Sequence, residues 1–224
     1  MGVRIVTDST AYLPSEVRAA HPDVIVVPLH AIIDGEEIVE GAPGSVAAVA
    51  DALRAGRGVS TSRPSPQSFF NAYETAVREG ATGIVSVHLS GALSATFDGA
   101  RTAAEAVEIP IAVVDSRLIG MAMGYAVCAA DDLARGGASL DEIVADCEAR
   151  LGRSRVFFYV DSLEYLRRGG RIGAAAALLG TALSVKPILT FADGAVVVRD
   201  KVRTAGRALD RLAALALAEV ASAG

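Results

Sequence analysis

The stretch GIVSVHLSGALSATF, residues 83–97, joins a run of mainly β-branched residues to a glycine and several hydroxyl groups. The run predicts a strand over residues 83–89, and the stretch after it predicts a helix over residues 92–107. Further strands are expected at residues 3–7, 24–33 and 111–115, and further helices at 14–20, 45–55, 66–79, 117–135 and 140–151. This alternation predicts an α/β fold, in which a mostly parallel sheet carries helices on both faces as a three-layer α/β/α domain.

The pattern changes after residue 152. Residues 1–152 carry 10 basic and 20 acidic side chains, whereas residues 153–203 carry 9 basic and 4 acidic ones. We therefore expect a first domain over residues 1–152 and a smaller α/β domain with a mixed sheet over residues 153–224. Its expected elements are strands at 156–161, 187–191 and 195–199, a buried helix at 172–184 and a last helix at 204–221. The Asp193-Gly194 pair predicts a hairpin, so the last two strands should be antiparallel.

Composition excludes several classes of protein. The 224 residues are 52% hydrophobic, enough for a large core, and the net charge of −5 argues against nucleic-acid binding. Uncharged runs stop short of the roughly 18 residues that a membrane span needs, so no stable membrane insertion is expected. The N-terminus does not resemble a signal peptide, and the two cysteines, Cys128 and Cys147, are interpreted as core thiols. We expect a cytoplasmic protein without a metal site.

Polar residues follow three of the expected strands, at Thr7-Asp8-Ser9-Thr10, Leu89-Ser90-Gly91 and Asp115-Ser116. In a parallel sheet these strand ends lie at one edge, where ligands bind, so the groups should converge. A helix starting near Ala92, with Ser94 and Thr96 beside it, would offer free N–H groups to an anion. The alternative, that Ser90 only caps the helix, stays open.

Two more stretches suit an anionic group. Thr61 and Ser62 lie in VSTSRPSP, residues 59–66, before a helix that Ser65 and Pro66 should begin. The stretch YLRRGGRIG, residues 165–173, forms a cationic turn whose arginines suit carboxylates or phosphates. Both have structural alternatives, a capped loop and a solvated loop.

Catalytic and nucleotide-binding motifs are lacking. The sequence contains neither G-x-x-x-x-G-K-[ST] nor G-x-G-x-x-G, the usual cradles of nucleotides. It also lacks the G-x-S-x-G turn of serine hydrolases, and a strand histidine such as His88 is more often structural than catalytic. No catalytic residue and no cofactor are therefore predicted.

Seven motifs in order resemble the DegV family: VTDSTAYLP (6–14), TSRPSP (61–66), VHLSGALSATF (87–97), VVDS (113–116), DSLEYLRRGGRIG (161–173), KPIL (186–189) and KVR (201–203). The resemblance implies a carrier that binds a long-chain fatty acid between two domains. It further implies that the carrier presents the carboxylate to a separate fatty acid kinase, which forms the acyl phosphate. The carrier would not itself be an enzyme.

The resemblance also implies roles for particular residues. Thr61 and Ser90 would hold the carboxylate, Arg171 and Arg203 would engage the kinase, and the remaining expected ligand-binding residues are Ser9, Ser62, Gly91 and Ser94. The family pattern Ser-Ser-Gly-Leu-Ser-Gly-Thr reads SGALSAT here, at residues 90–96, so one hydroxyl is lost. The family's C-terminal Gly-Ala-His-Thr-Gly-Pro-Gly segment is also missing, and the second domain is expected to be incomplete. Alternatives are a serine-dependent acyl hydrolase and a ligand-free regulatory remnant.

Overall fold

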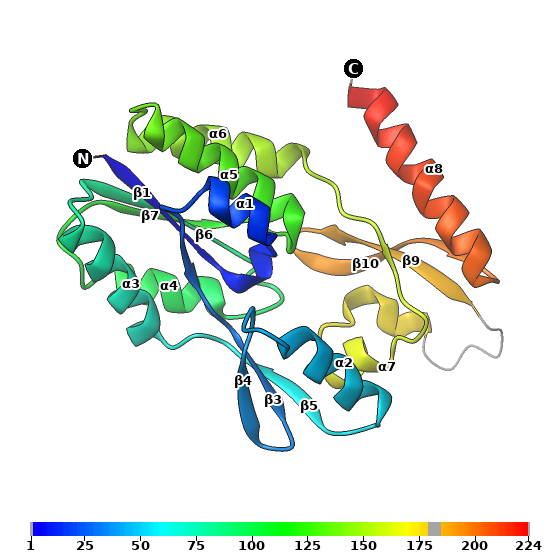
Figure 1. Cartoon of the computed structure of the whole chain (residues 1–224). Helices are drawn as coiled ribbons and strands as arrows, with labels where there is room; N and C mark the ends of the chain where they lie inside the picture. Colours follow the sequence, from blue (N-terminus) through cyan, green and yellow to red (C-terminus); the bar gives the residue numbers. More distant parts are fainter. Residues whose placement is uncertain (1, 179–184, 224) are drawn as a thin grey trace. The chain divides into compact units, whose positions relative to one another are not determined.

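The computed structural model describes residues 2–178 and 185–223. The chain divides into two compact units, Met1–Arg153 and Ser154–Gly224, which are described separately (Figure 1). The strands of the first unit are β1 (Val3–Asp8), β2 (Ile25–Val27), β3 (His30–Ile33), β4 (Glu36–Val39), β5 (Val59–Ser62), β6 (Gly83–His88) and β7 (Ile111–Asp115). Its helices are the 3₁₀ helix η1 (Ser9–Ala11), α1 (Ser15–Ala20), α2 (Ser45–Arg54), α3 (Pro66–Arg78), α4 (Thr96–Ala104), α5 (Met121–Arg135) and α6 (Leu140–Arg153).

The main sheet of the first unit has the order β2-β1-β6-β7, and every pair in it is parallel. Helices α3 and α4 pack on one face, and α5 and α6 pack on the other (Figure 1). All six residues of β6 are buried, as expected for a central strand covered on both faces. The predicted three-layer α/β/α arrangement is confirmed.

The core beneath the sheet is built on α3. Phe69 and Tyr73 are fully buried there, against Val6 of β1 and Ile84 of β6. Burying one such large side chain contributes about 1.5–3 kcal/mol to the free energy of unfolding. The helix begins as predicted, because Pro66 is its first residue and the Ser65 hydroxyl accepts the N–H of Ser68 at 3.2 Å.

The predicted single strand over residues 24–33 is wrong. It is two strands, β2 in the parallel sheet and β3 in a second sheet, separated by Pro28 and Leu29. Pro28 has no N–H to donate to a ladder, and the N–H of Leu29 turns instead to the Ser9 hydroxyl at 2.9 Å. The chain therefore leaves one sheet and enters the next.

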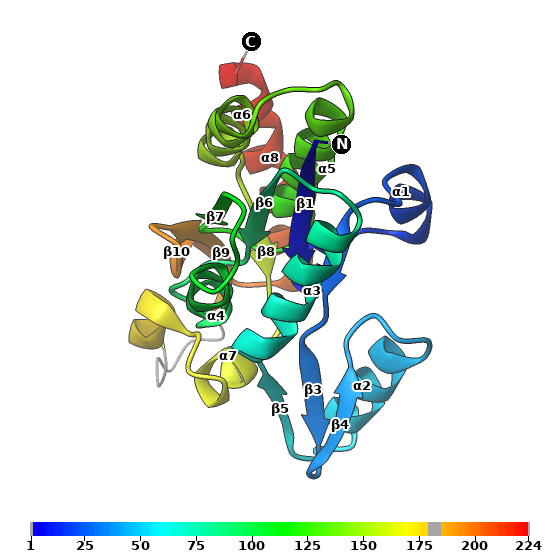
Figure 2. The ribbon, with the colours of Figure 1, turned by 90° about the vertical axis from the view of Figure 1, so that its left-hand side faces the viewer.

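The second sheet, of order β4-β3-β5, is antiparallel throughout and was not predicted (Figure 2). The hairpin between β3 and β4 turns at Asp34 and Gly35, which have φ angles of 51° and 92°. Glycine adopts such a positive φ angle without steric strain, which suits it to position 35. Thr61 pairs with Ala31 in this sheet, so the segment interpreted as a possible loop is a strand. This sheet presents the TSRPSP motif at its end.

The second unit contains strands β8 (Phe158–Tyr159), β9 (Lys186–Ala192) and β10 (Ala195–Val202), and helices α7 (Glu164–Arg168), η2 (Gly173–Leu178) and α8 (Ala205–Ala223). The sheet order is β10-β9-β8, and its described pairs are all antiparallel, where a mixed sheet was expected. The Asp193-Gly194 hairpin is confirmed, with φ angles of 48° and 79°.

The helix predicted over residues 172–184 begins as a 3₁₀ turn at Gly173, and residues 179–184 lie outside the described residues. Gly173 has a φ of +52°, and a Cβ there would collide with the carbonyl oxygen of Val196 on β10. Within residues 2–178 and 185–223, no helix is long and apolar enough to cross a bilayer.

Candidate functional site

The polar ends of β1, β6 and β7 meet at one edge of the main sheet, as predicted. Asp8 ends β1, and its Oδ2 lies 3.0 Å from Nδ1 of His88, which ends β6. The carbonyl of His88 accepts the N–H of Ser116 at 3.0 Å, and Oδ1 of Asp115 accepts the N–H of Gly91 at 3.2 Å. The three strand ends are therefore tied by hydrogen bonds into one cluster.

Asp8 is the most heavily bonded group of this cluster, and it has no exposed surface. Its Oδ1 accepts from the N–H of Thr10 at 3.0 Å and from the Thr10 hydroxyl at 2.5 Å. Its Oδ2 accepts from Leu89 N–H at 3.0 Å as well as from His88. Burial alone would raise the pKa of Asp8, but these hydrogen bonds and the charge of His88 outweigh it, and the pKa lies below its usual value.

The buried network continues behind His88. Nε2 of His88 lies 2.7 Å from the Ser86 hydroxyl, which lies 2.9 Å from the Tyr73 hydroxyl. Tyr73 in turn donates to the carbonyl of Ala100 at 3.3 Å, and burial raises its pKa to about 12. Ser86, His88 and Asp8 follow the order of a hydrolase triad, yet none of the three side chains has exposed surface. A substrate cannot reach this serine in the described arrangement.

The helix predicted from residue 92 begins at Thr96 instead, so α4 is shorter than expected. Residues between Gly91 and Ser94 form a turn whose N–H groups bond within the protein. Ser90 accepts from Ala92 N–H at 3.2 Å through its hydroxyl, and from Leu93 and Ser94 N–H at 3.0 and 3.1 Å through its carbonyl. The prediction of free amides at this point is wrong, because the turn and Asp115 already accept them.

Ser90 itself is fully buried, and Gly91, the residue after it, has close neighbours. A Cβ at Gly91 would lie 3.1 Å from Oδ2 of Asp115 and 3.7 Å from the ring of Phe97. A serine at this position would therefore press on Asp115. This explains sterically why glycine suits position 91 of this chain.

Ser9 is half-buried, and its hydroxyl is used within the protein. It donates to Oε2 of Glu40 at 2.5 Å and accepts the N–H of Leu29 at 2.9 Å. The hydroxyl thus fastens the start of η1 to the segments that flank the second sheet. A ligand carboxylate could bond to Ser9 only by replacing Glu40.

Thr61, Ser62 and Ser94 are more accessible. Thr61 is exposed, and Ser62 and Ser94 are half-buried. Arg63, which sequence reasoning missed, donates from Nη1 to the carbonyl of Ala95 at 3.2 Å. The end of β5 therefore lies beside the turn that carries Ser94, whose hydroxyl is 2.9 Å from that of Thr96. Nothing in the local sequence signals the bond to Ala95.

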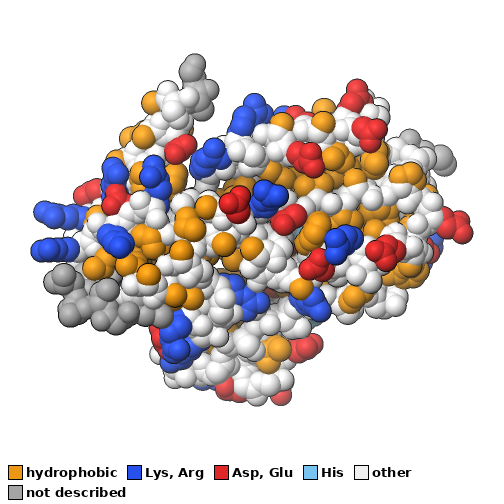
Figure 3. All heavy atoms as spheres, turned by 180° about the vertical axis from the view of Figure 1, so that it is seen from behind, with side chains coloured by type: hydrophobic (Ala, Val, Ile, Leu, Met, Phe, Trp, Pro, Cys, Tyr) orange, Lys and Arg blue, Asp and Glu red, His pale blue; other side chains and the backbone are white. Residues whose placement is uncertain are grey.

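The predicted partner-binding arginines belong to the second unit, and both are exposed. Arg171 follows α7 and donates to the carbonyl of Gly169 at 2.5 Å, whereas Arg203 follows β10. The neighbours Arg167 and Arg168 both bind Glu164 at 2.7 Å, and these hydrogen bonds lower the pKa of Glu164 to about 2. Lys and Arg side chains gather over this unit in the view of Figure 3.

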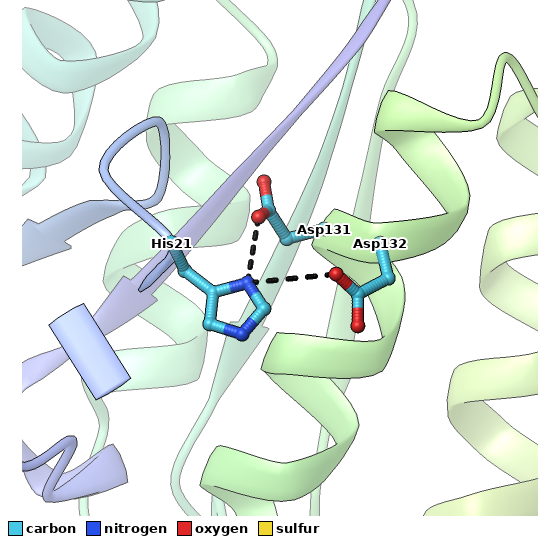
Figure 4. Close-up of side chains that lie close together, drawn as sticks. All are labelled: His21, Asp131 and Asp132. Atoms are coloured by element: carbon cyan, nitrogen blue, oxygen red, sulfur yellow. Dashed lines mark hydrogen bonds and ion pairs between the residues drawn. The ribbon is translucent and has the colours of Figure 1, made fainter. Parts of the chain in front are cut away.

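A second polar cluster joins α1 to α5 (Figure 4). Nδ1 of His21 lies 2.8 Å from Oδ2 of Asp131 and 3.9 Å from Oδ1 of Asp132, a donor set of the kind that binds metals. Arg135 already lies 3.5 Å from Asp131 and 2.9 Å from Asp132, and it donates to the carbonyl of Ala20. The hydrogen bond from His21 to Asp131 and the contacts of Arg135 with Asp131, Asp132 and Ala20 fasten α1 to α5.

Comparison with known proteins gives consistent results. Residues 2–223 match the model of a family described as "Uncharacterised protein, DegV family". A DegV domain-containing protein of Streptomyces coelicolor is 46% identical over 214 residues, which are 96% of this chain and 76% of the relative.

Among solved structures, a DegV family protein from Thermus thermophilus that binds fatty acid is 35% identical, with a TM-score of 0.89 over 98% of this chain and 78% of that one. DegV from Bacillus subtilis, a fatty acid binding protein, is 32% identical, with a TM-score of 0.86 over 99% and 79% of the two chains.

Proposed function

Because the chain belongs to the DegV family, we propose that it binds a long-chain fatty acid and holds the carboxylate with hydroxyl groups of the first unit. The observation that carries this proposal is the likeness, over 98% of the chain, to the Thermus thermophilus protein that binds fatty acid. Two further relatives with TM-scores of 0.86 and 0.89 are also described as fatty acid binding.

In this proposal the hydroxyl groups have different roles. Thr61 is exposed near the end of β5, so it contacts the carboxylate directly. Ser62 and Ser94 are half-buried and contribute further hydroxyl groups. Ser90 is buried and shapes the turn, and Gly91 lets the turn pass close to Asp115. Ser9 joins the site only when Glu40 moves off its hydroxyl.

The tail supplies affinity, and the hydroxyl groups supply orientation. Transfer of each methylene out of water contributes about 0.8 kcal/mol, so a sixteen-carbon tail gains more than roughly 10 kcal/mol before binding costs. Each hydrogen bond to the charged head group adds about 1.5–3 kcal/mol. Neutral donors orient the carboxylate without pairing it permanently with a fixed positive charge.

We further propose that the bound acid is phosphorylated by a separate, ATP-dependent kinase in the cytoplasm. The role of this protein is then that of a carrier and not of an enzyme. Arg171 and Arg203 are exposed on the second unit, where a kinase can contact them. Their charge suits an acidic surface on such a partner.

Native mass spectrometry of the protein purified from bacteria tests the first step. The expected result is an added mass equal to a sixteen- or eighteen-carbon acid, which increases on incubation with that acid. A bare polypeptide that takes up no acid would contradict the proposal. Hydrolysis of an acyl ester by the purified protein alone would instead favour an acyl hydrolase.

A further inference from the structure

The Asp8 carboxylate joins the two segments that carry Ser9 and Ser90. Its Oδ1 accepts two hydrogen bonds from Thr10, the residue after Ser9. Its Oδ2 accepts the N–H of Leu89, the residue before Ser90, and a hydrogen bond from His88. One side chain therefore fixes the main chain of two loops, the one after β1 and the one after β6.

We propose that Asp8, held by His88, is a positioning residue for the fatty-acid carboxylate, because it fixes the loops after β1 and β6 before the ligand arrives. This inference rests on the proposed function and deepens it. Asp8 does not touch the ligand, since it has no exposed surface and each of its oxygens already accepts two hydrogen bonds. It acts through the backbone at Thr10 and Leu89.

The charge of Asp8 is part of this arrangement. An ionised carboxylate only accepts hydrogen bonds, so Nδ1 of His88 must carry a proton and donate it. An amide at position 8 has one oxygen and one NH₂ group. If the amide oxygen accepts from Thr10, the NH₂ group faces the N–H of Leu89. If the amide oxygen accepts from Leu89, the NH₂ group faces the N–H of Thr10. Either orientation leaves two donors facing each other.

The far side of the network offers a matched control. The Ser86 hydroxyl bonds the other ring nitrogen of His88, and the Tyr73 hydroxyl bonds Ser86. These bonds reach neither of the two loops. The ring of Phe69 also packs edge-on against His88, with the centroids 4.9 Å apart. Removing the Tyr73 hydroxyl therefore weakens the same network and leaves all four bonds of Asp8 in place.

The test compares Asp8→Asn with Tyr73→Phe in the full chain, with hexadecanoic acid and its uncharged methyl ester as probes. For Asp8→Asn we expect at least a tenfold loss of affinity for the acid, less than a threefold change for the ester, and faster amide hydrogen exchange at Thr10 and Leu89. For Tyr73→Phe we expect both affinities within threefold of wild type. A merely structural role would lower both affinities together.

If Asp8→Asn does not fold, His88→Gln takes its place, with the same direction and a smaller loss expected. An acid affinity within threefold of wild type in the folded variant, or equal losses for acid and ester, would overturn the inference and leave the proposed function standing. Failure of the wild-type protein to bind either probe would overturn the proposed function, and this inference with it.

Discussion

The ends of β6 and β5 both carry hydroxyl-rich segments, but they differ in burial. At the end of β6, Ser86, His88 and Ser90 are fully buried, and the protein itself bonds their polar groups. At the end of β5, Thr61 is exposed and Ser62 is half-buried. Buried polar groups must form their hydrogen bonds within the protein, so they fix the conformation of the loops, whereas exposed hydroxyl groups remain accessible to a ligand.

The largest effect is expected in the buried region around His88. Phe69→Ala removes the ring that packs against His88 and Tyr73, and we expect it to lower the free energy of unfolding by about 3–5 kcal/mol. Urea unfolding measures this loss of stability. It is followed by circular dichroism, because the chain has no tryptophan whose fluorescence could report unfolding. Tyr12→Ala, at a side chain exposed by 63%, is the control and should change little. Equal losses in the two variants would contradict the assignment of the core.

The next largest effect is expected on ligand affinity, at the exposed hydroxyl of Thr61 on β5. Thr61→Val keeps the β-branched shape but removes the hydroxyl, so we expect affinity for a long-chain acid to fall about 10- to 100-fold, in line with one hydrogen bond to a charged group. The urea midpoint should stay unchanged, since Thr61 is exposed on β5. Thr61→Ser retains the hydroxyl and is the control. Wild-type affinity in Thr61→Val would remove Thr61 from the proposed site.

A smaller effect separates stability from binding. Tyr73→Phe removes the hydroxyl that bonds Ser86 and Ala100, and we expect a loss of about 1–2 kcal/mol in the free energy of unfolding. Chemical unfolding and acid titration on the same preparation measure both properties. A large loss of acid affinity with unchanged stability would show that the buried network touches the ligand.

The smallest effect is expected at an exposed carboxylate. Glu164→Gln breaks the pairs with Arg167 and Arg168, which are exposed and screened, so the urea midpoint at pH 7 should hardly change. The pKa of Glu164 in the folded protein is lowered from its ordinary value of 4.5 to about 2. Any stabilisation from its ion pairs is therefore fully present above pH 4.5 and is lost as the pH falls toward 2. Midpoints at pH 7 and pH 3 check this. A loss as large as that of Tyr73→Phe would contradict it.

Much of the fold could be predicted because its signals are local. The start of α3 was expected from the adjacent residues Ser65 and Pro66, and the Ser65 hydroxyl does accept the N–H of Ser68 at 3.2 Å. The Asp193-Gly194 hairpin follows in the same way from two adjacent residues. The strand over residues 24–33 was predicted wrongly, because a continuous apolar run does not say which sheet receives each half.

The candidate site was predictable only in part. The sequence singled out Thr61, Ser90 and the polar strand ends, and the ends of β1, β6 and β7 do meet. It did not indicate that the turn after Ser90 uses its own amides, or that Arg63 reaches Ala95. The bonds after Ser90 are local and correspond to the alternative in which Ser90 serves as a cap, whereas the bond from Arg63 to Ala95 joins residues 32 positions apart, which no local pattern reveals.

Periodicity, caps and turns act over a few neighbouring residues, so the alternation of strands and helices, the parallel sheet and the motifs could all be read from the order of the amino acids. The burial of Ser90 and the exposure of Thr61 follow instead from the packing of the folded chain. That packing also joins Asp8 to His88, 80 residues away in the chain. The physical reason is that a buried polar group finds its partners in space, after distant segments have packed together.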